Sequence, residues 1–178
     1  MITLNNRLQL VPVSAPYADQ MHSLMIACYP PVYAHLWEDG ARWYLQETYN
    51  AKRVLQDLQK PASPYYWVHW DEEAVGILWL HEEERSPDFP DQSALKLQRI
   101  YLHPKVHGNG IGKAVVQFVV EQAAKLDKEI IWLEAMDTQV SAHQFYEKVG
   151  FRKTGTFSLT FERMHPHYRG MVRMTRQI

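Results

Sequence analysis

The chain has 178 residues, 46% of them hydrophobic and 12% aromatic, which fits one globular domain with a substantial core. Its net charge of -1 provides no positive field for nucleic acid, and no apolar run approaches the roughly 18 residues that a membrane span needs. The single cysteine, Cys28, has no disulfide partner, and the first residues do not resemble a signal peptide. We therefore expect one cytoplasmic domain over residues 1–178 that binds neither nucleic acid nor a membrane.

Prolines and polar caps divide the N-terminal half into short elements. Ser14 fits the start of a helix, which Pro30 and Pro31 interrupt. The expected elements are a strand over residues 8–13, helices over 15–29, 39–50 and 51–60, and strands over 65–70 and 74–82 joined by a turn at 71–73. An acidic run, Glu82-Glu83-Glu84, closes the last strand. It is either a solvated hairpin tip or a surface that attracts a cation.

A strand over residues 95–102 leads into a glycine-rich loop and a helix. Leu95 and Leu97 alternate with Lys96 and Gln98, as in a half-buried strand. After the loop, apolar residues recur at helical spacing from Val115 to Ala123. The glycines therefore lie at a strand-to-helix junction.

The loop itself reads His107-Gly108-Asn109-Gly110-Ile111-Gly112-Lys113. Alternating glycines expose successive backbone N–H groups to an anion, and the new helix adds the positive end of its dipole. A Walker A loop would need glycine at His107 and Ser or Thr at Ala114. A dinucleotide-binding loop would need glycine at Lys113. Both patterns fail, so the loop predicts a pyrophosphate site of a third kind.

The C-terminal third predicts another strand and helix, then a closing hairpin. Residues 130–136 are apolar except for Glu134 near the middle, and a helix follows from Ser141 to the glycine at Gly150. The hairpin is expected over residues 154–162 and 168–176. Strands and helices without a repeat or linker predict one α/β domain.

Two segments resemble motifs of the GCN5-related N-acetyltransferases (GNAT). The glycine loop resembles their motif A, [Gln/Arg]-x-x-Gly-x-[Gly/Ala], with His107 at the first position. The run Phe145-Tyr146-Glu147-Lys148-Val149-Gly150-Phe151 is similar to the end of their motif B, whose asparagine maps onto Gln139. A more diffuse similarity over the whole chain points to polyamine acetyltransferases of the PaiA type.

The resemblance implies a fold, a co-substrate and an activity. The fold would be an α/β (α+β) domain whose twisted, mixed but mostly antiparallel sheet has about seven strands, with helices on both faces and strands splayed at the cofactor site. The activity would be direct acetyl transfer from acetyl-CoA to a primary amine, polyamine-like rather than a protein. Two alternatives stay open: a protein or peptide N-acetyltransferase, and a non-catalytic acyl-CoA-binding module. Exposed strand edges leave a homodimer open as well.

The resemblance also assigns residues to the cofactor. Backbone N–H groups of the loop would hold the pyrophosphate, and Tyr146 would protonate the departing thiolate. The N–H of Leu102 is the candidate oxyanion donor. The expected cofactor-binding residues are Ile100, Tyr101, Leu102, His107, Gly108, Asn109, Gly110, Ile111, Gly112, Lys113, Gln139, Ser141 and Tyr146.

The general base has no single candidate. Glu134 is a carboxylate whose pKa partial burial would raise, but it could equally face solvent or pair with a basic side chain. His103 and a chain of water molecules are the alternatives. We expect Cys28 to be a buried structural thiol, because nothing places a base beside it.

An aromatic cluster marks the expected acceptor site. Tyr33, Trp37 and Tyr44 are the candidates, with Tyr29 and Trp43 beside them, because aromatic faces attract ammonium groups. Core packing is the alternative role of these residues. We expect no metal, since the pair of histidines at 165 and 167 lacks a third ligand.

Overall fold

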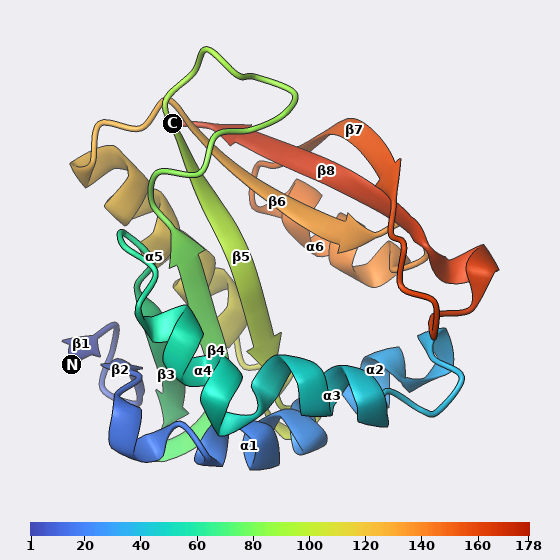
Figure 1. Ribbon diagram of the computed structural model, residues 1–178. Coiled ribbons are helices and arrows are strands. Elements are labelled where there is room, and N and C mark those ends of the chain that lie inside the picture. The colour runs from blue at the N-terminus through green and yellow to red at the C-terminus, as the bar shows by residue number, and fades with distance from the viewer.

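One eight-stranded sheet organises the computed structural model, which describes residues 1–178 (Figure 1). Its strand order is β1-β2-β3-β4-β5-β6-β8-β7, and every neighbouring pair is antiparallel except β5 and β6. The strands are β1 (Ile2–Thr3), β2 (Leu8–Pro12), β3 (Tyr65–Trp70), β4 (Glu73–His81), β5 (Ala94–Leu102), β6 (Ile130–Met136), β7 (Arg152–Ser158) and β8 (Gly170–Gln177). The expected fold class is therefore confirmed. The additional strand is β1, which is too short to produce a sequence pattern.

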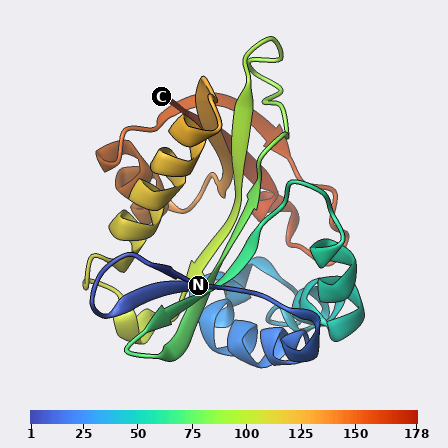
Figure 2. The ribbon, with the colours of Figure 1, turned by 90° about the vertical axis from the view of Figure 1, so that its left-hand side faces the viewer.

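Helices cover both faces of this sheet (Figure 2). They are α1 (Gln20–Cys28), α2 (Pro30–Tyr33), α3 (Arg42–Tyr49), α4 (Ala51–Leu58), α5 (Ile111–Lys125) and α6 (Val140–Lys148). Helices α1 to α4 lie on one face and α5 with α6 on the other. No helix is both long and apolar enough to cross a membrane.

The helix boundaries depart from expectation in the first forty residues. The segment expected as one helix over 15–29 is a 3₁₀ turn, Ala15–Tyr17, followed by α1. Pro30 ends α1 as expected but also begins α2, because proline is tolerated at the first position of a helix. The closing hairpin forms as β7 and β8, and its strand ends differ from the expected ones by one to four residues.

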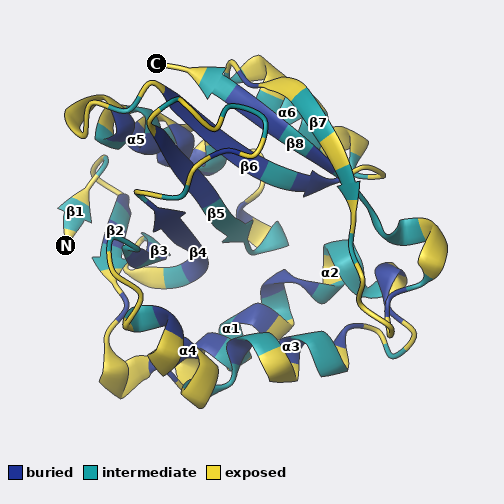
Figure 3. Cartoon of the chain, turned by 45° about the horizontal axis from the view of Figure 1, so that its top comes forward, coloured by how far each residue is buried: buried dark blue, intermediate teal, exposed yellow.

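Two apolar cores hold the layers together, and the central strands are buried in Figure 3. One core joins the sheet to α5 through Leu95, Val115 and Val119. The other joins it to α1 and α3 through Met25 and Leu45. Because β4 and β5 are covered on both faces, successive residues from Val75 to His81 and from Ala94 to Leu97 are buried without alternation.

The half-buried pattern expected for residues 95–102 is wrong at Lys96. This side chain is only 9% exposed, and its ammonium group lies 2.8 Å from a Glu84 oxygen and 3.2 Å from a Glu134 oxygen. Glu84 also contacts Lys60 and His81. Glu84, the last residue of the acidic run, is therefore part of an ion-pair network and is not free to attract a substrate, whereas Glu83 is exposed.

Strands β5 and β6 separate as the sequence resemblance implies. They pair only from Ala94 opposite Ile130 to Lys96 opposite Trp132. Just beyond, Leu97 pairs with Leu80 and Arg99 with Trp79, so Gln98 is an extra residue without a partner on β4. Such a β-bulge bends its strand and increases the twist. The remainder of β5 consequently diverges from β6 and leaves an opening between them.

Candidate active site

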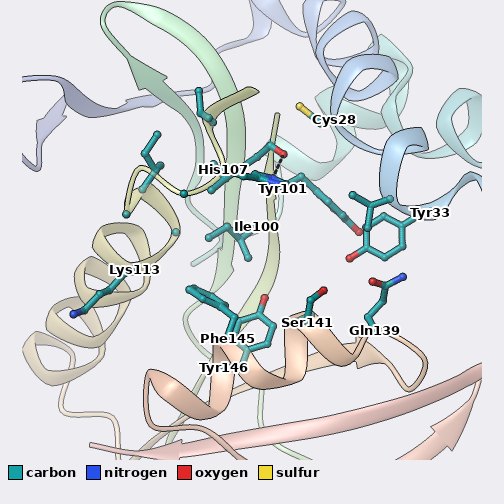
Figure 4. A pocket seen from close by; sticks show the side chains of 18 residues that line it. Cys28, Tyr33, Ile100, Tyr101, His107, Lys113, Gln139, Ser141, Phe145 and Tyr146 are labelled. Atoms are coloured by element: carbon teal, nitrogen blue, oxygen red, sulfur yellow. Dashed lines mark hydrogen bonds between the residues drawn. The ribbon is translucent and has the colours of Figure 1, made fainter. Parts of the chain in front are cut away.

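A cavity of about 510 Å³ occupies one side of this opening (Figure 4). The end of β5, the glycine loop, the start of α5 and one face of α6 enclose it. All but one of the expected cofactor-binding residues line it: Ile100, Tyr101, Leu102, His107, Gly108, Gly110, Ile111, Gly112, Lys113, Gln139, Ser141 and Tyr146. The exception is Asn109, whose side-chain amide donates to the carbonyl of Val106 at 3.1 Å and so shapes the loop.

The glycine loop presents a row of unpaired donors to this cavity. None of the backbone N–H groups of residues 108–113 donates a hydrogen bond within the chain, and the next one, from Ala114, bonds to Gly110 at 3.0 Å. Gly108 and Gly110 have φ of 82° and 75°, a region that side chains disfavour. Residues 111–113 are the first turn of α5, whose N–H groups have no partner within a helix, and residues 108–110 extend this row into the exposed loop. Such a row of donors at a helix start can bind an anion.

Two side chains of the loop do not point at the anion site. The Nε2 of His107 donates to the Leu102 carbonyl at 3.2 Å, which ties the loop to the end of β5 (Figure 4). The Lys113 side chain points away from Tyr146 and Ser141 in Figure 4. The loop therefore contributes mainly its backbone to the site.

The Leu102 amide faces the opening. The next N–H, that of His103, donates to Val75 at 2.7 Å and so points toward β4. Successive backbone groups of a strand point to opposite edges, which directs the Leu102 N–H to the side that β6 has left. The His103 ring accepts from the Lys105 N–H at 3.0 Å and lines neither cavity, so it shapes the turn.

Helix α6 supplies the polar side chains of the cavity. Figure 4 shows Gln139, Ser141 and Tyr146 on the side of α6 that faces β5. Burial raises the pKa of the Tyr146 phenol well above its ordinary value, with a smaller contribution from Tyr33. The phenol is therefore protonated at neutral pH and can act as a hydrogen-bond or proton donor.

Cys28 also borders this cavity but is chemically quiet. Its residue is 2% exposed, and burial raises the pKa of the thiol to about 11. A thiol with that pKa is almost fully protonated at neutral pH and is a poor nucleophile. The expected buried thiol is thus found, although at the wall of a cavity.

A second cavity of about 510 Å³ lies on the other side of the opening, between α3, the middle of β5 and the end of β6. Tyr33 and Tyr101 line both cavities. Trp37 and Tyr44, also expected at the acceptor site, line only this one, and their rings stack with centroids 4.7 Å apart. Tyr29 and Trp37 are at most 4% exposed. These aromatic residues therefore pack the core, which was one of the two sequence interpretations, and they also wall a cavity. Their role toward an acceptor stays a prediction.

Charged groups complete the second cavity. Glu134 lines it and pairs with Lys96, one of the alternatives left open by the sequence. Arg99 lines it as well, although the sequence analysis did not single it out. The available signal was a guanidinium directly before the apolar end of a strand, which needs a partner when buried. No three His, Cys, Asp or Glu side chains converge as a metal site would require.

Sequence comparison links this chain to acetyltransferases. The profile of the acetyltransferase (GNAT) family matches residues 18–151. An uncharacterised N-acetyltransferase of Mycobacterium tuberculosis is 31% identical over 130 residues, which is 73% of this chain and 79% of that protein. One from Lactobacillus delbrueckii subsp. lactis is 28% identical over 116 residues, 65% of this chain and 66% of that protein. Human N-acetylaspartate synthetase is 30% identical over 103 residues, 57% of this chain but only 32% of the synthetase.

Solved structures share the fold at low sequence identity. PaiA N-acetyltransferase from Thermoplasma acidophilum, in complex with coenzyme A, has a TM-score of 0.71 at 15% identity and covers 96% of this chain and 99% of its own. RimL, a ribosomal L7/L12 α-N-protein acetyltransferase in complex with coenzyme A, has a TM-score of 0.75 at 16% identity. The match covers 99% of this chain and 97% of RimL. A mutant of spermidine N-acetyltransferase SpeG from Vibrio cholerae has a TM-score of 0.68 at 16% identity. The match covers 97% of this chain and 95% of SpeG.

Proposed function

Because the chain belongs to the acetyltransferase (GNAT) family, we propose that it transfers an acetyl group directly from acetyl-CoA to a small primary amine. The observation that carries this proposal is the row of six unpaired N–H groups over residues 108–113, at a cavity beside splayed strands. A pyrophosphate is an anion of the size and charge that such a row accepts.

The residues around the first cavity fit acetyl-CoA as co-substrate. The N–H groups of residues 108–113 would bind the pyrophosphate, and the apolar wall formed by Ile100, Val106 and Phe145 would contact the pantetheine arm. Gln139 and Ser141 add polar contacts from α6. Bound in this way, acetyl-CoA supplies an activated acyl group at the opening between β5 and β6.

Amide formation from a thioester needs three kinds of assistance: polarisation of the carbonyl, protonation of the leaving thiolate and removal of a proton from the amine. We assign the first to the Leu102 N–H, which faces the opening. We assign the second to Tyr146, whose partly buried phenol has a raised pKa and is protonated. No covalent enzyme intermediate is required, in keeping with the unreactive Cys28 thiol.

Glu134 is our candidate for removing the proton from the amine. Its carboxylate lines the second cavity, from which the amine would approach, and can take the proton directly or through water. The aromatic rings of Trp37 and Tyr44 attract the ammonium form of the acceptor by cation–π interaction. The two cavities thus support separate sites for the two substrates.

The names of the similar proteins refer to two kinds of small molecule and to one protein. SpeG is named for spermidine, and N-acetylaspartate synthetase for an acetylated amino acid. RimL is named for a ribosomal protein. A small acceptor, including the polyamine type expected from the sequence, agrees better with a second cavity of about 510 Å³.

The test is release of free coenzyme A thiol from acetyl-CoA, measured with a panel of amines, amino acids and peptides. Stimulated release with at least one small amine supports the proposal. Tight binding of acetyl-CoA with no release by any acceptor would instead favour a regulatory acyl-CoA-binding module.

A further inference from the structure

The second cavity contains a buried guanidinium that the chain leaves partly unpaired. The Arg99 side chain is 11% exposed and lines this cavity. Its Nη1 is fully buried and donates no hydrogen bond. The Asp57 Oδ2 lies 3.7 Å from Nη1, which is beyond hydrogen-bond distance, and that oxygen also has no hydrogen-bond partner.

Aromatic rings hold this guanidinium in one position. It lies over the Trp79 ring at 4.7 Å from the centroid and over the Tyr49 ring at 5.0 Å. Asp57 is shared with Arg53, whose Nε donates to its other oxygen at 3.0 Å. Arg99 is therefore fixed in place, yet its Nη1 donates no hydrogen bond within the chain. A buried charge is costly unless it is paired and hydrogen-bonded, so a ligand that completes the pairing is favoured.

The same cavity also offers groups that suit a cation. The buried Oε1 of Gln98 is a hydrogen-bond acceptor without a partner. Glu134 contributes a carboxylate, and Trp37 and Tyr44 contribute aromatic faces. An ammonium group fits these three features. It does not fit Arg99, which repels cations and pairs best with a planar carboxylate.

We propose that the acceptor is an amino acid whose carboxylate binds Arg99 while its amine is acetylated at the opening between β5 and β6. This inference rests on the proposed acetyl transfer and narrows its substrate class. Arg99 precedes Leu102 by three residues, or about 10 Å along the strand. An amino acid together with its contacts to both residues spans a distance of that order.

Matched acceptors test the proposal on the unaltered protein. Thiol release would be compared for each common amino acid and its α-carboxamide, which differ only in the charged group. Ornithine against putrescine and lysine against cadaverine extend the comparison to acceptors with the same terminal amines. We expect at least one amino acid to exceed its carboxamide by about 30-fold or more in kcat/KM, because a neutral carboxamide forms no charged pair with the Arg99 guanidinium.

A second comparison separates recognition from structural support. Arg99→Gln should remove most of the preference for the carboxylate, so that amino acid and carboxamide become similar acceptors. Arg7→Gln is the matched control, since Arg7 also lies over a tryptophan, Trp70, and pairs with an aspartate, Asp71, but lines neither cavity. A purely structural Arg99 would lower the rates of both acceptors by the same factor and leave their ratio unchanged.

The outcomes distinguish this inference from the function on which it rests. If spermidine, putrescine or the carboxamides are the better acceptors, acetyl transfer stands and recognition by Arg99 is refuted. If acetyl-CoA binds but no acceptor releases thiol, the proposed function fails and the inference fails with it. Preference for the amino acid that survives in Arg99→Gln would also contradict the role of this residue.

Discussion

The rings of Tyr33 and Tyr101 meet edge to face, at an interplanar angle of 89° and with centroids 5.9 Å apart, where the two cavities adjoin. Tyr33 comes from α2 and Tyr101 from β5, so residues 68 positions apart form one wall. In the proposed reaction the acetyl group passes beside these two rings, from acetyl-CoA in the first cavity to the acceptor in the second.

Removing one of these rings should therefore weaken the binding of both acetyl-CoA and the acceptor. We expect Tyr33→Ala to raise the KM of acetyl-CoA and of the acceptor, because its ring lines both cavities. Trp43→Ala, a change confined to the second cavity, should raise only the acceptor KM. Steady-state kinetics with each substrate varied in turn measures the difference. A Tyr33 variant that changes a single KM would contradict a shared wall.

The anion site should depend on Gly110. Gly110→Val places a branched side chain at φ of 75° beside the unpaired N–H groups, and we expect a loss of about tenfold or more in acetyl-CoA affinity. Gly40→Val is the matched control, since Gly40 has φ of 70°, an equally open environment and no place in either cavity. Calorimetric titration of both variants would show whether affinity is lost only at Gly110. Equal losses would mean that backbone strain alone is responsible.

Tyr146→Phe should separate catalysis from binding. Removing the phenolic proton donor should lower kcat by about 100-fold while acetyl-CoA affinity changes little, because the ring remains in place. Tyr17→Phe, at an exposed tyrosine outside both cavities, serves as control. An unchanged kcat in Tyr146→Phe would remove this residue as the acid.

Glu134→Gln should produce a defect that depends on pH. At neutral pH most of a primary amine is protonated, so loss of a proton acceptor should lower kcat/KM for the acceptor by about 10- to 100-fold. At higher pH the amine loses its proton to solvent, and the difference from the unaltered protein should shrink. A defect of the same size from pH 7 to pH 9.5 would indicate that Glu134 has no part in proton transfer.

Glu84 should link stability to pH. Burial raises the pKa of its carboxyl, but hydrogen bonds and charge from Lys96, with hydrogen bonds from His81 and Lys60, outweigh burial and lower the pKa to about 2. A lowered pKa in the folded protein stabilises it above the ordinary value near 4.5, and this contribution disappears as pH falls toward 2. Because the side chain is about one-third exposed, we expect Glu84→Gln to cost about 1–2 kcal/mol at pH 7. Urea unfolding at pH 7 and pH 3 should show that difference shrinking, and a cost that is equal at both values would contradict it.

Much of the fold was predictable because its signals are local. The apolar spacing from Val115 to Ala123 predicts a helix with one buried face, and α5 buries that face. The glycines at 108 and 110 predict a loop at a strand-to-helix junction, and the structure places both there, directly before α5. Such features depend on backbone conformations that a few neighbouring residues determine.

Other features could not be predicted, because they depend on contacts between distant segments. The burial of Lys96 follows from the central place of β5 and from partners 12 and 38 residues away in the chain. The bulge at Gln98 is visible only in the pairing of β5 with β4. For the same reason the sequence pattern did not show that Arg99 faces the aromatic cluster.

The sequence by itself determined the family and the place of the proposed anion site, since glycines directly before a helix let its first N–H groups meet an anion closely. Only the tertiary structure decided what lies opposite that site. Tyr33 of α2, Arg99 of β5 and Glu134 of β6 all line the adjoining cavities at the opening between β5 and β6. The proposed substrate recognition depends on those long-range contacts, and they exist only once the sheet has formed.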